Sequence, residues 1–100
     1  MLNQLVVIGR LVENPWSEKN DEQNNFKITL AVPKNYKNSN GQYDTDFITC
    51  VLNNNIGKTT SEYCKKGDLL GLKGHVETKD NCMLVIAEKV TFLSSKTNNE

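Results

Sequence analysis

The sequence holds few of the residues that build metal centres, disulfide frameworks and nucleophilic active sites. It has one histidine, His75, and three cysteines, Cys50, Cys64 and Cys82, which are widely spaced and form no CxxC pair. This cysteine pattern argues against disulfides and zinc, so we expect reduced cysteines that pack as small apolar residues. His75 has no serine, cysteine or metal-ligand partner nearby in sequence, which favours an exposed strand histidine over a catalytic base. We therefore expect no enzyme activity, no metal and no cofactor.

A phosphate-binding loop for nucleotide hydrolysis is also missing. Gly57-Lys58-Thr59 follows a predicted strand and begins a predicted helix, as the end of such a loop would. The full pattern, however, requires a glycine where Leu52 stands. The three residues therefore do not predict nucleotide hydrolysis.

Long hydrophobic runs are absent. No apolar stretch approaches the roughly 20 residues that span a bilayer, so we expect no membrane partner. The first residues, 1–4, lack the basic and apolar regions of a signal peptide, which predicts a cytoplasmic location.

The chain has no net charge, because its 12 basic residues are balanced by 12 acidic residues. This balance argues against a general polycation, but the charges are unevenly distributed along the chain. Residues 23–43 include Lys27, Lys34 and Lys37 and no acidic residue. A neutral protein with such a stretch can still present one basic face to nucleic acid.

Alternating and β-branched residues predict strands, and one stretch with helical spacing predicts a short helix. The strands are expected at 3–12, 26–32, 46–53, 68–79 and 82–93, and the helix at 56–66, where lysines would fill the last turn and Gly67 would follow. The turn signals are Asn40-Gly41 and Asp80-Asn81. Gly9 predicts a bend or bulge, and Pro33 predicts either the end of a ladder or a position at a sheet edge.

Three strands, a helix and two further strands follow one another in the order of the OB topology. We therefore predict an all-β protein, a five-stranded OB-fold barrel with one short helix between strands 3 and 4. A chain of 100 residues suffices for one domain. We place this domain at 1–93, followed by a polar tail at 94–100 that we expect to be disordered.

In this order the residues resemble the bacterial single-stranded DNA-binding protein family, from Met1 to Leu93. Each motif is weak by itself, but seven of them in family order and spacing are specific. They are Met1-Leu2-Asn3 with Val7-Ile8-Gly9-Arg10-Leu11, Asn14-Pro15, Phe26 with Leu30-Ala31-Val32, Asp46-Phe47-Ile48, Glu62-Tyr63-Cys64-Lys65-Lys66-Gly67, Leu72-Lys73-Gly74-His75-Val76, and Val85-Ile86-Ala87-Glu88 with Val90 and Phe92-Leu93.

The resemblance implies sequence-non-specific binding of single-stranded DNA in replication, recombination or repair. It also implies a homo-oligomer, a tetramer or a dimer, with replication or recombination proteins as further partners. In this family bases stack on exposed rings while lysines follow the phosphates, and stacking contributes roughly 1–3 kcal/mol per base.

Carried over by position, the stacking rings of the family fall on Tyr36 and Phe47, although either ring could instead serve packing. Trp16, in the predicted loop at 13–25, could stack a base, pin the loop to the barrel or lie in a subunit interface. The expected phosphate contacts are Lys27, Lys34, Lys37, Lys73 and Lys79.

The sequence also departs from the family. Asn53 stands where an aromatic residue is usual, Glu77 stands where a basic residue is common, and the hairpin at 79–82 is short. The acidic C-terminal tail of many members is not present, so the chain resembles a short form. These departures predict weaker binding or a shorter footprint. They also support an alternative, a protein-interaction OB module of the primosome accessory type with weak or lost DNA binding.

Overall fold

The computed structural model describes residues 1–17 and 25–95, so most of the predicted tail at 94–100 lies outside the described residues. Along the chain the elements are β1 (Leu5–Leu11), β2 (Trp16–Ser17), β3 (Phe26–Lys37), β4 (Tyr43–Leu52), α1 (Asn54–Tyr63), β5 (Leu69–Lys79) and β6 (Cys82–Ser94).

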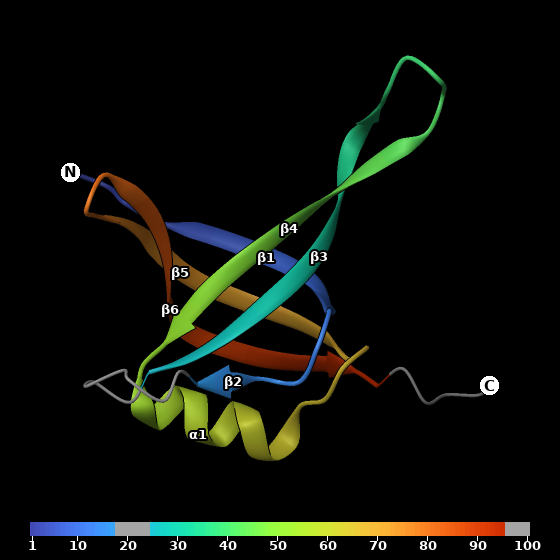
Figure 1. The fold of residues 1–100 in the computed structure, drawn as a ribbon. Helices are drawn as coiled ribbons and strands as arrows, with labels where there is room; N and C mark the ends of the chain where they lie inside the picture. Colours follow the sequence, from blue (N-terminus) through green and yellow to red (C-terminus); the bar gives the residue numbers. More distant parts are fainter. Residues whose placement is uncertain (18–24, 96–100) are drawn as a thin grey trace.

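The long strands close into a barrel (Figure 1). They are hydrogen-bonded in the order β1-β5-β6-β4-β3, and β3 returns to β1 where Arg10 pairs with Ala31. All of these pairings are antiparallel except β4 with β6, where Cys50 lies beside Val85. A five-stranded barrel with a helix between its third and fourth long strands is the OB fold. The predicted fold is therefore confirmed.

The barrel core comes from alternate positions of its strands. The fully buried side chains are Ile28, Leu30, Cys50, Leu52, Leu70 and Leu72. Because side chains alternate across a strand, the residues between them point away from the core. Lys27 and Thr29 on β3 and Phe47 and Thr49 on β4 are thereby placed on the outer face of the barrel.

Gly74 is required where β5 lies against β6. The register shifts between Lys73 and Gly74, and a Cβ atom on Gly74 would collide with the backbone carbonyl oxygen of Ile86. Gly71, on the same strand, has room for a Cβ, since the nearest atom would lie 3.6 Å away. The close approach of β5 to β6 therefore needs a residue without a Cβ atom at Gly74.

Helix α1 begins and ends earlier than the sequence predicted. Asn53 caps it, because its side-chain oxygen accepts a hydrogen bond from the Ile56 amide at 2.9 Å. The expectation of lysines in the last turn is wrong. Lys65 and Lys66 follow the helix, and their amides donate to Asp68 and Asn14 instead of continuing it.

Three further expectations hold only in part. Residues 13–25 are not all loop, because Trp16–Ser17 forms β2 against β3. Regular pairing with β4 stops at the Pro33–Thr45 pair, as one of the two alternatives for Pro33 predicted, although β3 itself continues to Lys37. Of the bend or bulge predicted at Gly9, the bulge toward β5 is wrong, because β1 pairs with β5 in continuous register from Leu5 to Arg10.

Candidate nucleic-acid interface

The β3–β4 hairpin extends well beyond the barrel and carries most of the predicted site residues (Figure 1). Its loop is fixed by Asn38, whose side-chain oxygen accepts hydrogen bonds from the amides of Asn40 and Gln42 at 2.8 and 3.0 Å. The Gly41 amide donates to the Asn38 carbonyl, and Gly41 has a φ of 77°. Asn38 is therefore the first residue of the turn and Gly41 is the fourth. Asn40-Gly41 does not form a two-residue turn.

Three aromatic rings on this hairpin are open to solvent. Tyr36 and Phe47 are each 66% exposed, and Tyr43 is 56% exposed. Phe47 pairs with Ala31, whose small side chain leaves space beside the ring. Exposed rings on a hairpin offer the flat surfaces on which unpaired bases stack. Tyr43 was missed in the sequence, where its place next to the Asn40-Gly41 turn could have indicated it.

Two of the predicted lysines lie against these rings. The Nζ atom of Lys34 is 5.8 Å from the centre of the Tyr36 ring, and that of Lys37 is 5.8 Å from the centre of the Tyr43 ring. Ammonium groups at this distance interact with the ring face. The hairpin thus carries both lysines, which can follow a DNA backbone, and aromatic rings, on which bases can stack.

The hairpin is not free of acidic groups, although residues 23–43 are. Strand β4 brings Asp46 to Lys34, where the Nζ and Oδ1 atoms are 2.7 Å apart. This hydrogen bond to Asp46 raises the pKa of Lys34 above its usual value. Asp44 accepts a hydrogen bond from the Asn38 side chain at 3.0 Å. Lys34 is therefore partly neutralised, and Lys37 is the less compensated cation of the two.

Trp16 and Lys27 lie together near the other end of β3. They are paired across β2 and β3, and Lys27 is also paired with Val51 on β4. Trp16 and Lys27 are half-buried, so Trp16 packs on the barrel instead of standing in an open loop. Between them and Phe47, the hydroxyl groups of Thr29 and Thr49 form a hydrogen bond of 2.9 Å.

The structure separates Lys73 and Lys79 from the hairpin. Lys73 lies on the outer face of β5, between Val6 of β1 and Lys89 of β6. Lys79 stands at the end of the β5–β6 hairpin, beside a tight turn in which Asp80 and Asn81 have φ values of 54° and 64°. The roles of all the site residues in DNA binding stay predictions.

Two of the three cysteines pack as expected, and the third does not. Cys50 and Cys64 are buried and Cys82 is exposed, and all three are free thiols. Burial raises the pKa of Cys50 to about 11, so its thiol is protonated at neutral pH. No helix among the described residues is long and apolar enough to cross a membrane.

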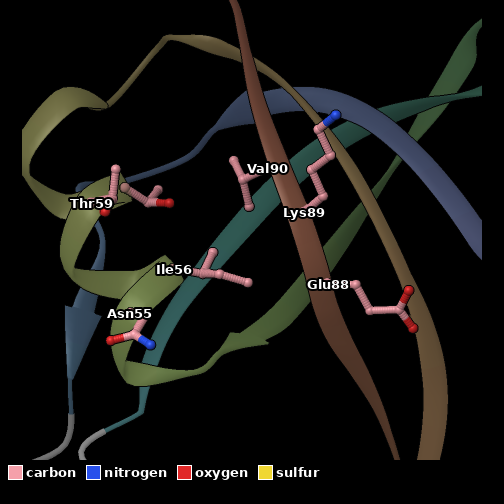
Figure 2. Close-up of a pocket in the computed structure, with 7 residues that line it drawn as sticks. Asn55, Ile56, Thr59, Glu88, Lys89 and Val90 are labelled. Carbon is pink, nitrogen blue, oxygen red and sulfur yellow. The ribbon is translucent and has the colours of Figure 1, made fainter.

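Two of the hollows formed by the described residues lie near the elements discussed above. One of about 250 Å³ lies on the hairpin and includes Lys34, Tyr36 and Asp46. The other, of about 360 Å³, lies between α1 and β6, where Ile56 and Val90 contribute to its lining (Figure 2). Only the first adjoins the exposed rings, so the hairpin remains the candidate site.

An OB barrel with exposed rings and cations on one hairpin defines the class of oligonucleotide-binding OB domains. The model of the single-strand binding protein family matches residues 2–83, and the chain belongs to this family.

Relatives span nearly the whole chain. It is 34% identical to single-stranded DNA-binding protein 2 of Listeria monocytogenes, over 99% of this chain and 68% of that protein. It is 32% identical to single-stranded DNA-binding protein B of Bacillus subtilis, over 96% of this chain and 94% of that protein. Among solved structures, the SSB of Plasmodium falciparum in complex with ssDNA has a TM-score of 0.73 at 21% identity and covers 94% of this chain and 96% of that chain. This likeness supports the OB fold.

Proposed function

We propose that the protein binds single-stranded DNA without sequence preference, on the β3–β4 hairpin and the adjoining outer face of the barrel. The observation that carries the proposal is the gathering of Tyr36, Tyr43 and Phe47 with Lys34 and Lys37 on one exposed hairpin. Membership of the single-strand binding protein family supports it.

In this proposal the rings take the bases and the lysines take the phosphates. Every base has a π-face, so stacking on Tyr36 and Phe47 does not select a sequence. Lys37 and Lys27 neutralise phosphates and release condensed counterions, which makes the affinity depend on salt. Duplex DNA hides its base faces in the stack and cannot use the rings.

Replacing Lys37 with glutamine tests the phosphate contact. Each lost contact should reduce the slope of log affinity against log salt by about 0.7 for a single strand. Lys58, an exposed lysine on α1, provides the matched control, and Lys58→Gln should leave the slope unchanged. Titration of a fluorescent thymidine oligomer at several salt concentrations measures both slopes. An unchanged slope in Lys37→Gln would remove this lysine from the interface.

The homo-oligomer is likewise a proposal. Val6 and Ile8 on β1 are 72% and 54% exposed, and the side chains of Ile8 and the exposed Leu93 both lie beside Gly71. An exposed apolar patch on a sheet is typical of a subunit interface. Replacing Val6 and Ile8 with serine should lower the mass measured by sedimentation while the fold is retained. An unchanged mass would place the interface elsewhere.

Several further properties of the protein are also proposals. We propose that the protein acts in replication, recombination or repair, as a tetramer or dimer, and that it catalyses no reaction. The boundaries of the OB domain, 1–93, and contacts with replication or recombination proteins are proposals too. A cytoplasmic location stays a prediction that cell fractionation would check.

A further inference from the structure

A compact charged cluster on β5 and β6 has no part in the hairpin site. His75 Nε2 lies 2.6 Å from Glu77 Oε2, and His75 Nδ1 lies 2.6 Å from Glu88 Oε2. Figure 2 shows the Glu88 carboxylate directed away from helix α1, toward the neighbouring β5. One imidazole ring is thus held between two carboxylates.

With both carboxylates ionised, this geometry favours a protonated histidine. Carboxylates only accept hydrogen bonds, and both ring nitrogens are donors only in the imidazolium form. Hydrogen bonds to Glu77 and then Glu88 accordingly raise the pKa of His75 above 6.5. The cluster has one positive and two negative charges when His75 is protonated. It has two uncompensated negative charges when His75 is neutral.

The strand register places the cluster at the end of a row across the outer face of the barrel. Lys27 on β3 pairs with Val51 on β4, Val51 pairs with Ile86 on β6, and Ile86 pairs with His75 on β5. A strand of DNA that follows β3 from the aromatic hairpin to Lys27 and then turns along this row passes over the apolar Val51 and Ile86. It then reaches the carboxylates.

We propose that the His75–Glu77–Glu88 cluster marks where the path of single-stranded DNA ends on the β5–β6 side, and that protonation of His75 sets how strongly this edge repels phosphates. The inference rests on the proposed function. The charged neighbours on β5 and β6 are Lys73 and Lys89, which pair with each other, while β4 contributes the uncharged Val51 to the row.

The sign of the pH dependence follows from the raised pKa. Below pH 6.5 His75 is protonated, so the cluster is intact and its charge is least negative. As pH rises above 6.5 and through the raised pKa, His75 loses its proton and the repulsion grows. Affinity for a strand long enough to reach the cluster should fall over this range.

Two thymidine oligomers test whether the cluster marks the end of the DNA path. One has about 8 and the other about 16 nucleotides, within the range of footprints of one OB domain. The double variant Glu77→Gln, Glu88→Gln should bind the longer oligomer about threefold to fivefold more tightly, the range expected for a pair of exposed charges. The shorter oligomer should change by less than about twofold. Glu62→Gln on α1, which removes an exposed carboxylate elsewhere, should change neither.

Titrations of the longer oligomer from about pH 6 to about pH 9 test the protonation step. Wild-type affinity for the longer oligomer should fall with rising pH. The His75→Gln variant should lack this pH-dependent fall and should bind the oligomer weakly over the whole pH range. Equal gains on both oligomers in the double variant, or the same pH profile in His75→Gln, would overturn the inference. Failure of the wild-type protein to bind either oligomer would instead overturn the proposed function. Sedimentation of each variant excludes a change of assembly as the cause.

Discussion

Replacing both Tyr36 and Phe47 with alanine is expected to cost about 2–6 kcal/mol of single-stranded DNA binding, since each stacked base contributes roughly 1–3 kcal/mol. Both rings are 66% exposed, so the substitutions remove little core packing. The melting temperature should therefore stay close to that of the wild-type protein. Fluorescence titration of a labelled thymidine oligomer measures the loss of affinity.

Tyr63 supplies the matched control for these rings. It is 72% exposed at the end of α1, outside the hairpin, so Tyr63→Ala removes an equally accessible ring. Its affinity for the oligomer should match that of the wild-type protein. If the double variant and Tyr63→Ala bound equally well, the rings of the hairpin would not be stacking platforms. If only one of the single variants, Tyr36→Ala or Phe47→Ala, lost affinity, stacking would be assigned to that ring alone.

Replacing Gly74 with alanine is expected to destabilise the barrel by about 3 kcal/mol, the upper end of the usual range for overpacking. The new Cβ atom would meet the backbone carbonyl of Ile86, which cannot move without breaking the β5–β6 pairing. For a domain of this size the loss corresponds to roughly 12–24 °C in the melting temperature.

Gly71→Ala is the control for this substitution. It adds the same methyl group to the same strand, but the nearest atoms there are side-chain carbons of Leu93 and Ile8 at 3.6 and 3.9 Å. Thermal unfolding followed by circular dichroism should show a small change for Gly71→Ala and a large one for Gly74→Ala. Similar melting temperatures for the two variants would contradict the role assigned to Gly74.

The fold could be predicted from the sequence because its signals are local. Alternation along 26–32 and the turn at Asp80-Asn81 are properties of neighbouring residues, and both hold in the structure. The helix end was mispredicted because distant partners decide it. The amide of Lys66 donates to Asn14, a contact that spacing along the chain does not reveal.

The candidate site was only partly predictable, for the same reason. Tyr36 and Phe47 are exposed as expected, but the charge around them depends on which strand lies opposite. Asp46 comes to Lys34 through β4, so a stretch without acids in sequence is not without acids in space. Glu77 is only two residues from His75, but Glu88 reaches the same ring through the β5–β6 pairing, which spacing along the chain does not reveal.

Binding of single-stranded DNA through the β3–β4 hairpin is tested by fluorescence anisotropy. The probe is a labelled thymidine oligomer of about 30 nucleotides, long enough for several OB domains. Wild-type protein is titrated at two salt concentrations, with a duplex of equal length as the control. We predict tight binding of the single strand, weakened by salt, and little binding of the duplex. Equal binding of both forms, or none at low salt, would contradict this prediction, and the second result would favour the protein-interaction alternative.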